Sequence, residues 1–269
     1  MTAKRGHLAI SEAFRRAADA RRAAVIPYVT VGFPSREASI ELAAAAIDGG
    51  ADLLELGIPF SDPLADGPTI QEATTRALAN GTAVRDCLDV ARELRRRYPR
   101  IPLLFMGYAN PILAFGESAF VKACVEVGVD GLIVPDLPPE ESRDLEDPCR
   151  MAGLALVHLV APGTPENRVK MLCERTSGFV YLVSVAGTTG ARRAVDAGLP
   201  EVVARVRAAT NHPIAVGFGI STPEHAARVA HIADGVIVGS AVIERCGEPD
   251  AVTKVRAFVS ALRSASIRA

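Results

Sequence analysis

The stretch LELGIPFSDPLADGPTIQ, residues 54 to 71, holds the densest set of groups that could carry out chemistry. Glu55 is the one carboxylate in an otherwise apolar run, and Asp62 and Asp66 follow it in the next loop. An ionised carboxylate is costly to bury unless it is paired, so burial should raise the pKa of Glu55 toward neutrality, where it can donate and accept a proton. Two alternatives stay open: Glu55 could be bonded to a Tyr or Ser for structure, and Asp66 could be the N-cap of the next helix.

A second cluster consists of glycines in three late segments, VAGTTG (185 to 190), GFGIS (217 to 221) and Gly239-Ser240. Glycine lets backbone N–H groups approach an anion, and a helix that begins after Gly239 would direct its positive end to the same place. The three segments together favour a phosphomonoester, although a turn explains any one glycine. A Walker-type or GxGxxG pattern is missing, so a nucleotide is not implied.

Short apolar runs alternate with helical patterns along the whole chain, and they are apolar on both faces, as in a parallel sheet covered by helices. The runs are 24–29, 52–57, 102–107, 131–135, 154–160, 179–184, 213–218 and 234–239. Eight such units without a linker predict a single (β/α)8 barrel domain over residues 1–269, a fold of about 250 residues. An open doubly wound sheet is the alternative, but TVGFPS after the first run is not a dinucleotide turn.

Helix signals separate the runs. Pro68 should open a helix that Gly81 ends, Pro223 should open another, and Thr82 should cap the helix that follows it. Residues 8–22 predict an extra amphipathic helix that plugs the lower end of the barrel. Pro148 should break or kink the helix predicted over 139 to 152.

In a barrel the catalytic groups lie at the carboxyl ends of the strands and in the loops that follow. The lysines all fall in the N-terminal tail or in expected helices, so a Schiff-base nucleophile is lacking there: Lys4, Lys122, Lys170 and Lys254. His158 is the histidine that falls in an expected strand, and a histidine without neighbouring ligands is more typical of a hydrogen-bonded core residue. We therefore expect no metal, and carboxylates and tyrosines remain.

Composition limits the function classes. Of 269 residues 49% are hydrophobic and 23% charged, as in globular proteins, and the net charge of -1 gives no signature for nucleic acid or anionic lipid. The five cysteines form no CxxC pair, so reduced thiols are expected. The start, MTAKRGHLAI, lacks the pattern of a signal peptide, and no run is long enough to span a membrane. We expect a cytoplasmic protein with neither nucleic acid nor membrane partners.

Taken together, the motifs resemble the tryptophan synthase alpha chain family over essentially the whole length. The motifs are residues 54–71, YANPIL (108–113), DLPPEES (136–142), YLVSVAGTTG (181–190), GFGIS (217–221) and GSAVI (239–243). The resemblance implies a barrel enzyme, without a cofactor of its own, that cleaves indole-3-glycerol phosphate to indole and glyceraldehyde 3-phosphate. It also implies an α2β2 heterotetramer whose beta chain uses pyridoxal phosphate (PLP) to condense indole with serine.

Position by position, the resemblance implies a catalytic glutamate at Glu55, a catalytic aspartate at Asp66 and a tyrosine beside the substrate at Tyr181. It further implies phosphate positions at Gly190, Gly219, Gly239 and Ser240, indole-pocket positions at Tyr28, Ile133 and Ile237, and a loop threonine at Thr189. Thr189 is expected to bond the aspartate when a mobile loop over 187–199 closes. Pro135 departs from the family pattern and narrows the indole pocket in this interpretation.

The chemistry agrees with these assignments. Cleavage needs an electron sink, which forms when indole C3 is protonated, and then the loss of a hydroxyl proton. Glu55 suits both transfers, while Asp66 could accept the indole N1–H. Two rivals remain: another phosphate-binding barrel of tryptophan biosynthesis, which would favour a lysine at a strand end, and a catalytically idle barrel that regulates a partner enzyme.

Two loops on the active-site side, 59–63 and 108–115, are rich in Pro, Ile, Leu and Phe. An apolar patch beside a mouth that admits a charged substrate predicts a docking surface for the beta chain. The interface residues in this prediction are Pro59, Asp62, Asn110 and Pro111. The alternative is that Ile112, Leu113 and Phe115 pack under the following helix.

Overall fold

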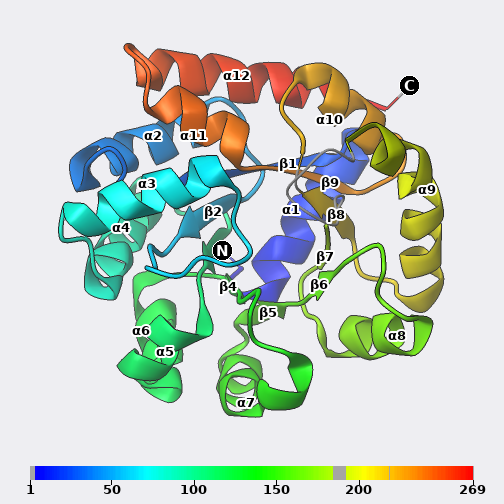
Figure 1. Ribbon diagram of the computed structural model, residues 1–269, viewed down its shortest axis with the longest axis horizontal. Coiled ribbons are helices and arrows are strands. Elements are labelled where there is room, and N and C mark those ends of the chain that lie inside the picture. The colour runs from blue at the N-terminus through cyan, green and yellow to red at the C-terminus, as the bar shows by residue number, and fades with distance from the viewer. Residues whose placement is uncertain (1–3, 184–191, 218, 269) are drawn as a thin grey trace.

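The computed structural model describes residues 4–183, 192–217 and 219–268, in which parallel strands form a nearly closed barrel inside a ring of helices (Figure 1). The strands are β1 (Ala24–Thr30), β2 (Leu54–Gly57), β3 (Leu103–Met106), β4 (Gly131–Ile133), β5 (Ala155–Val157), β6 (Leu159–Val160), β7 (Val180–Val183), β8 (Ile214–Gly217) and β9 (Gly235–Val238). Each overlaps a run expected from the sequence. The predicted (β/α)8 barrel is therefore confirmed.

The predicted run 154–160 is divided at His158 into β5 and β6. Within the described residues the strands follow the order β5-β4-β3-β2-β1-β9-β8-β7-β6. Because β5 pairs with β4 and β6 pairs with β7, the fifth run joins both ends of this order. The split strand thus completes the ring.

Helices surround the barrel, and all but α1 come after the first strand (Figure 1). They are α1 (His7–Asp19), α2 (Arg36–Asp48), α3 (Pro68–Ala79), α4 (Val84–Arg97), α5 (Ala109–Phe115), α6 (Glu117–Val127), the 3-10 turn η1 (Pro139–Glu141), α7 (Arg143–Ala152), α8 (Glu166–Arg175), α9 (Arg192–Ala209), α10 (Pro223–Ala230), α11 (Ser240–Cys246) and α12 (Ala251–Ala265). Helix α12 packs against α2, so the end of the chain meets its beginning. Among the described helices none is both long and apolar enough to cross a membrane.

The extra helix α1 packs against the starts of the strands. Ile10 lies against Gly131 and Gly178, and the ring of Phe14 lies 5.4 Å from that of Phe179. These contacts lie at the amino ends of β4 and β7, opposite the end at which a barrel builds its active site. The predicted extra N-terminal helix is confirmed.

The amino ends of the strands are joined in pairs by a repeated hydrogen-bond bracket. In each bracket, a polar residue just before one strand donates its N–H to the carbonyl of a residue on the preceding strand, and its side chain accepts the N–H of that same residue. The four pairs are Asp52 with Val25, Asp130 with Leu103, Ser177 with Leu156 and Asp234 with Ile214. An arginine pairs with each carboxylate: Arg22 with Asp52, Arg95 with Asp130 and Arg207 with Asp234. The brackets therefore connect neighbouring strands at the amino ends of the barrel.

Three sequence expectations need correction. Thr82 is not a cap: the N-cap of α4 is Ala83, whose N–H donates to the Asp86 carboxylate at 2.9 Å. The helix predicted over 139 to 152 is not broken at Pro148: α7 continues through this residue, held by the buried Leu145 and Cys149, and the break lies at Ser142, between η1 and α7. In the predicted loop 187–199, residues 187–191 lie outside the described residues, and α9 is already helical from Arg192.

Candidate active site

Strand register places Tyr28 and Glu55 next to each other on the inner face of the barrel. Tyr28 of β1 is the partner of Glu55 on β2, and paired positions of parallel strands direct their side chains to the same face. The hydroxyl of Tyr28 fills the space beside Gly57, two residues after Glu55. The predicted acid–base residue and the predicted pocket tyrosine therefore share one surface.

The same register brings the other strand residues of the prediction to this face. On the β9 side of β1, Ile26 pairs with Ile237. Two residues earlier on β9, Gly235 pairs with Ala215 of β8, which in turn pairs with Tyr181 of β7. On the other side, Glu55 of β2 pairs with Leu104 of β3, which pairs with Gly131 of β4. Ile133 lies two residues after Gly131 and therefore faces the same way. Tyr181, Ile237 and Ile133 are all buried.

Glu55 is a fully buried carboxyl group without a described partner. Its exposed fraction is 0%, and neither carboxyl oxygen has a hydrogen-bond partner among the residues that the structure describes. Burial raises the pKa of Glu55 to about 8. The structural alternative, a glutamate bonded to a Tyr or Ser, finds no support in the described residues, and the group is mainly protonated near pH 7.

Asp66 is buried and bonded to a residue that the sequence argument missed. Tyr108, which follows β3, donates its hydroxyl to Oδ2 of Asp66 at 3.0 Å. Burial raises the pKa of Asp66 to about 6, against the lowering effect of this hydrogen bond. The N-cap of α3 is Gly67 and no side chain caps that helix, so the capping alternative for Asp66 is wrong. Near pH 7 the group is mainly ionised.

Two tyrosines complete the interior. Burial, together with the charges of Asp66 and Glu55, raises the pKa of both Tyr28 and Tyr181 well above its ordinary value. Thr30 donates a hydrogen bond to the Tyr28 hydroxyl at 3.4 Å. The two phenols and the two carboxyl groups therefore lie within electrostatic reach of one another.

The predicted phosphate positions lie at the ends of later strands. Gly219 has a φ of +76°, which suits glycine, and Gly239 is the N-cap of α11, whose first residue is the exposed Ser240. The first N–H groups of a helix have no partner within it and are open to an anion. Gly190 and Thr189 lie outside the described residues.

The loops predicted to dock a partner differ in exposure. Asp62 and Asn110 are exposed, Pro111 is half-buried, and Pro59, which was expected at the interface, is buried. Ile112 is buried and Phe115 packs against Phe120, as the packing alternative expected. Leu64 and Leu113 remain exposed, by 89% and 54%. Leu64 comes directly after the predicted loop 59–63, and Leu113 lies within the predicted loop 108–115.

The remaining candidates lie away from this interior. Lys4 precedes α1, and the other lysines lie on α6, α8 and α12, as expected. His158 is buried, and burial lowers its pKa. Its Nε2 atom has no partner within the described ranges. Neither residue type reaches the pair of carboxylates.

A (β/α)8 barrel that holds two buried carboxyl groups, with pKa values of about 8 and about 6, defines an enzyme of acid–base chemistry. Comparisons with known proteins narrow this class. A family model described as the tryptophan synthase alpha chain matches residues 14–266. The chain belongs to the tryptophan synthase alpha chain family.

Two relatives and two solved structures illustrate the similarity. The alpha chain of Chloroflexus aurantiacus is 49% identical over 96% of this chain and 98% of its own, and that of Halorhodospira halophila is 48% identical over 95% of each. Tryptophan synthase of Mycobacterium tuberculosis matches with a TM-score of 0.90 and 35% identity, over 97% of this chain and 98% of its own. The Legionella pneumophila alpha chain matches with a TM-score of 0.87 and 37% identity, over 96% of each chain.

Family membership makes the chain a lyase of tryptophan biosynthesis. Alpha chains of this family pair with a beta chain, and PLP belongs to that beta chain. The assignment of individual catalytic residues rests on the geometry.

Proposed function

We propose that the chain cleaves indole-3-glycerol phosphate to indole and glyceraldehyde 3-phosphate, with Glu55 as acid and base. The observation that carries this proposal is the burial of the Glu55 carboxyl group, with a pKa of about 8, near Asp66, with a pKa of about 6. Near pH 7 Glu55 is mainly protonated and can donate its proton, whereas Asp66 is mainly ionised and can accept a hydrogen bond. Environments that separate two carboxyl pKa values in this way assign the acid and its partner.

The reaction proceeds in two proton transfers. Glu55 donates its proton to C3 of the indole ring, and the positive charge that develops on the ring is stabilised by Asp66 at the N1–H. The Glu55 carboxylate then removes the proton of the hydroxyl group on the carbon attached to C3. An aldehyde forms, the carbon–carbon bond breaks, and its electron pair returns to the ring to give indole.

The other inner residues bind the substrate in this proposal. Tyr28, Ile133 and Ile237 line the indole ring, and Tyr181 lies beside the glycerol portion. The phosphate is held by backbone N–H groups near Gly219 and Gly239, by the Ser240 hydroxyl and by Gly190. Closure of the segment that carries Thr189 would exclude water. Because all bond changes are proton transfers and a carbon–carbon cleavage, the chain needs neither a metal nor a cofactor of its own.

Supply of indole to a partner is the second part of the proposal. The exposed side chains of Leu64 and Leu113, beside Asp62 and Asn110, offer an apolar surface at the active-site end. We place the beta chain on this surface, in an α2β2 heterotetramer that receives indole directly. We propose that the complex works in the cytoplasm and that residues 1–269 form one domain.

The test is to add indole-3-glycerol phosphate to the purified chain, alone and with saturating beta chain but without serine. Indole is measured by chromatography, and glyceraldehyde 3-phosphate by a coupled dehydrogenase. The two products should appear in equal amounts and faster with the beta chain present. A folded chain that releases neither product under either condition would overturn the proposal.

A further inference from the structure

The hydroxyl of Tyr108 connects the loop that carries Asp66 to the end of β3. It lies 3.0 Å from Oδ2 of Asp66 and 3.0 Å from the backbone nitrogen of Ala65. The nitrogen of Ala65 can only donate, so the hydroxyl accepts from it. The single hydrogen of the phenol is therefore directed to Asp66.

Tyr108 is itself held from three sides. It is buried, its ring packs against that of Phe60 with centroids 5.4 Å apart, and it forms the N-cap of α5. The N–H of the next residue, Ala109, donates to Oδ1 of Asp136 at 2.9 Å, in the loop after β4. The phenol therefore has little freedom, and a hydrogen bond from a fixed donor fixes the direction of its acceptor.

The second oxygen of Asp66 has a different environment. Oδ1 is buried and has no hydrogen-bond partner among residues 4–183, 192–217 and 219–268. A buried carboxylate oxygen without a partner is costly, and a donor from a bound ligand would satisfy it. The N1–H of an indole ring is such a donor.

We propose that Tyr108 is a positioning residue for the cleavage reaction: its hydroxyl holds Oδ2 of Asp66 and so presents Oδ1 to the N1–H of the substrate. This inference rests on the proposed function and adds to it a separate role for each Asp66 oxygen: Oδ2 accepts from Tyr108 and Oδ1 accepts from the substrate. The bond to Tyr108 additionally stabilises the ionised form of Asp66, the form that accepts a hydrogen bond.

The decisive variant is Tyr108→Phe, which keeps the ring against Phe60 and removes the hydroxyl. Loss of a hydrogen bond to a charged group should lower kcat roughly 10- to 100-fold. KM for indole-3-glycerol phosphate should change less, because in this proposal the Tyr108 hydroxyl bonds Asp66 and not the substrate. The acidic limb of the pH profile should move upward, since the hydroxyl lowers the pKa of Asp66.

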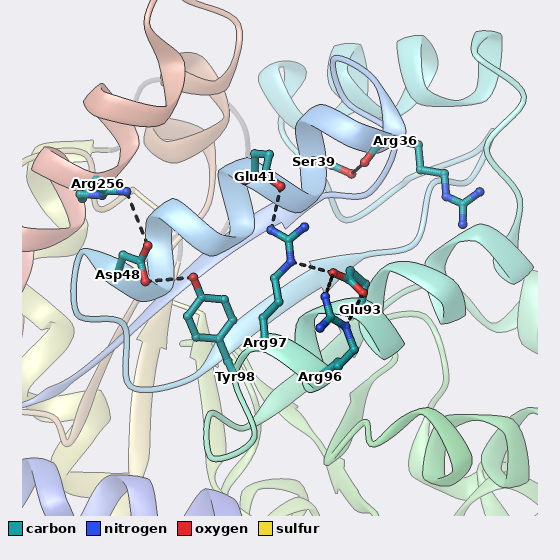
Figure 2. Close-up of polar contacts among 9 residues, drawn as sticks. All are labelled: Arg36, Ser39, Glu41, Asp48, Glu93, Arg96, Arg97, Tyr98 and Arg256. Carbon is teal, nitrogen blue, oxygen red and sulfur yellow. Dashed lines mark hydrogen bonds and ion pairs between the residues drawn. The ribbon is translucent and has the colours of Figure 1, made fainter.

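The outer surface of the barrel offers a matched control. Tyr98 donates its hydroxyl to Oδ1 of Asp48 at 2.9 Å, and Asp48 also pairs with Arg256 of α12 at 3.5 Å (Figure 2). Tyr98→Phe makes the same chemical change on a tyrosine–aspartate pair. It should leave kcat, KM and the pH profile of cleavage as in the wild type.

A double-mutant cycle tests whether Tyr108 acts through Asp66. In an Asp66→Asn background, Tyr108→Phe should cause little further loss of kcat, because the charge that the hydroxyl positions is already gone. If the loss of kcat in the double variant equals the product of the losses in the two single variants, the two residues act independently and the inference is overturned. A Tyr108→Phe protein with wild-type kcat and an unmoved acidic limb would also overturn it.

An NMR titration of the Asp66 side-chain carboxyl carbon in the ligand-free chain separates this inference from the proposed function. The pKa of Asp66 should be higher in Tyr108→Phe than in the wild type and unchanged in Tyr98→Phe. Equal titration of Asp66 in all three proteins would overturn the role of Tyr108 even if the wild type cleaves normally. A wild type that does not cleave would overturn the proposed function, whatever the titration gives.

Discussion

The hydroxyl of Tyr28 occupies the space that a Cβ atom on Gly57 would need. Gly57 ends β2, two residues after Glu55, and Tyr28 is the register partner of Glu55. A residue without a side chain at position 57 therefore lets the phenol lie across β2 beside the Glu55 carboxyl group. Gly217 and Tyr181 are related in the same way on the other side of the barrel.

Gly57→Ala should therefore push Tyr28 out of position. Because the barrel interior is closely packed, we expect a loss of about 1–3 kcal/mol in the free energy of unfolding and a clear fall in cleavage. Gly163→Ala is the control, since a Cβ at Gly163 would have no neighbour within 4 Å. Chemical denaturation and turnover measure both effects, and a Gly57→Ala protein with wild-type values of both would contradict this packing argument.

The pH dependence of cleavage should be bell-shaped. The proposed mechanism requires ionised Asp66, so kcat/KM should fall as the pH drops below about 6, where that carboxylate gains a proton. It also requires protonated Glu55, so kcat/KM should fall as the pH rises above about 8. A profile at constant ionic strength with its maximum between these values supports the assignment, whereas a profile that keeps rising through pH 9 argues for a different acid.

Glu55 should make the folded chain less stable at alkaline pH. Its pKa is raised from 4.5 to about 8, so the unfolded chain releases this proton at a lower pH than the folded chain. The stability present below pH 4.5 is lost progressively up to about pH 8, and the loss is on the order of 5 kcal/mol at most.

Glu55→Gln removes this titration. Its free energy of unfolding should therefore increase relative to the wild type between pH 5 and pH 8, as measured by urea denaturation. Glu126→Gln is the control because its side chain is exposed on α6, and it should follow the wild type. A constant difference between Glu55→Gln and the wild type across this range would mean that Glu55 is not buried as a neutral acid.

Leu64→Asp should weaken docking of the beta chain. The side chain of Leu64 is 89% exposed on the loop between β2 and α3, where a partner would cover it. Titration with the beta chain at fixed alpha chain should give a stimulation of cleavage that saturates at one beta chain per alpha chain, and Leu64→Asp should need more beta chain. Met151→Asp, with 85% exposure on α7, is the control. Equal titration curves for the two variants would remove this surface from the interface.

Much of the barrel can be predicted from sequence because apolar runs and helical patterns alternate without interruption. The division of the fifth run at His158 could not be predicted, because nothing in LALVHLV shows where the chain stops pairing with β4 and begins to pair with β7. The brackets at Asp52, Asp130 and Asp234 were missed for a similar reason. An aspartate before a strand has the same local sequence whether or not it reaches across to the preceding strand.

The burial of the Glu55 carboxyl group could be predicted because Glu55 is the one charged residue in an apolar strand, while its catalytic role stays a proposal. Tyr108 could not be recognised by its spacing from Asp66, because it follows β3 whereas Asp66 lies in the loop after β2. A usable signal was its place directly after the third strand, at the active-site end. Pro59 was expected at a surface but is buried, since a proline next to a strand end can pack inward as readily as outward.

The central claim, that Glu55 carries the proton in the cleavage of indole-3-glycerol phosphate, is tested most directly by single-turnover kinetics of Glu55→Gln. The amide keeps the shape of the side chain but cannot transfer a proton, so the rate of indole release should fall roughly 10²- to 10⁴-fold. Circular dichroism should show that the variant is folded. A folded Glu55→Gln protein that releases indole at a rate comparable to the wild type would contradict the assignment of Glu55 as the catalytic acid and base.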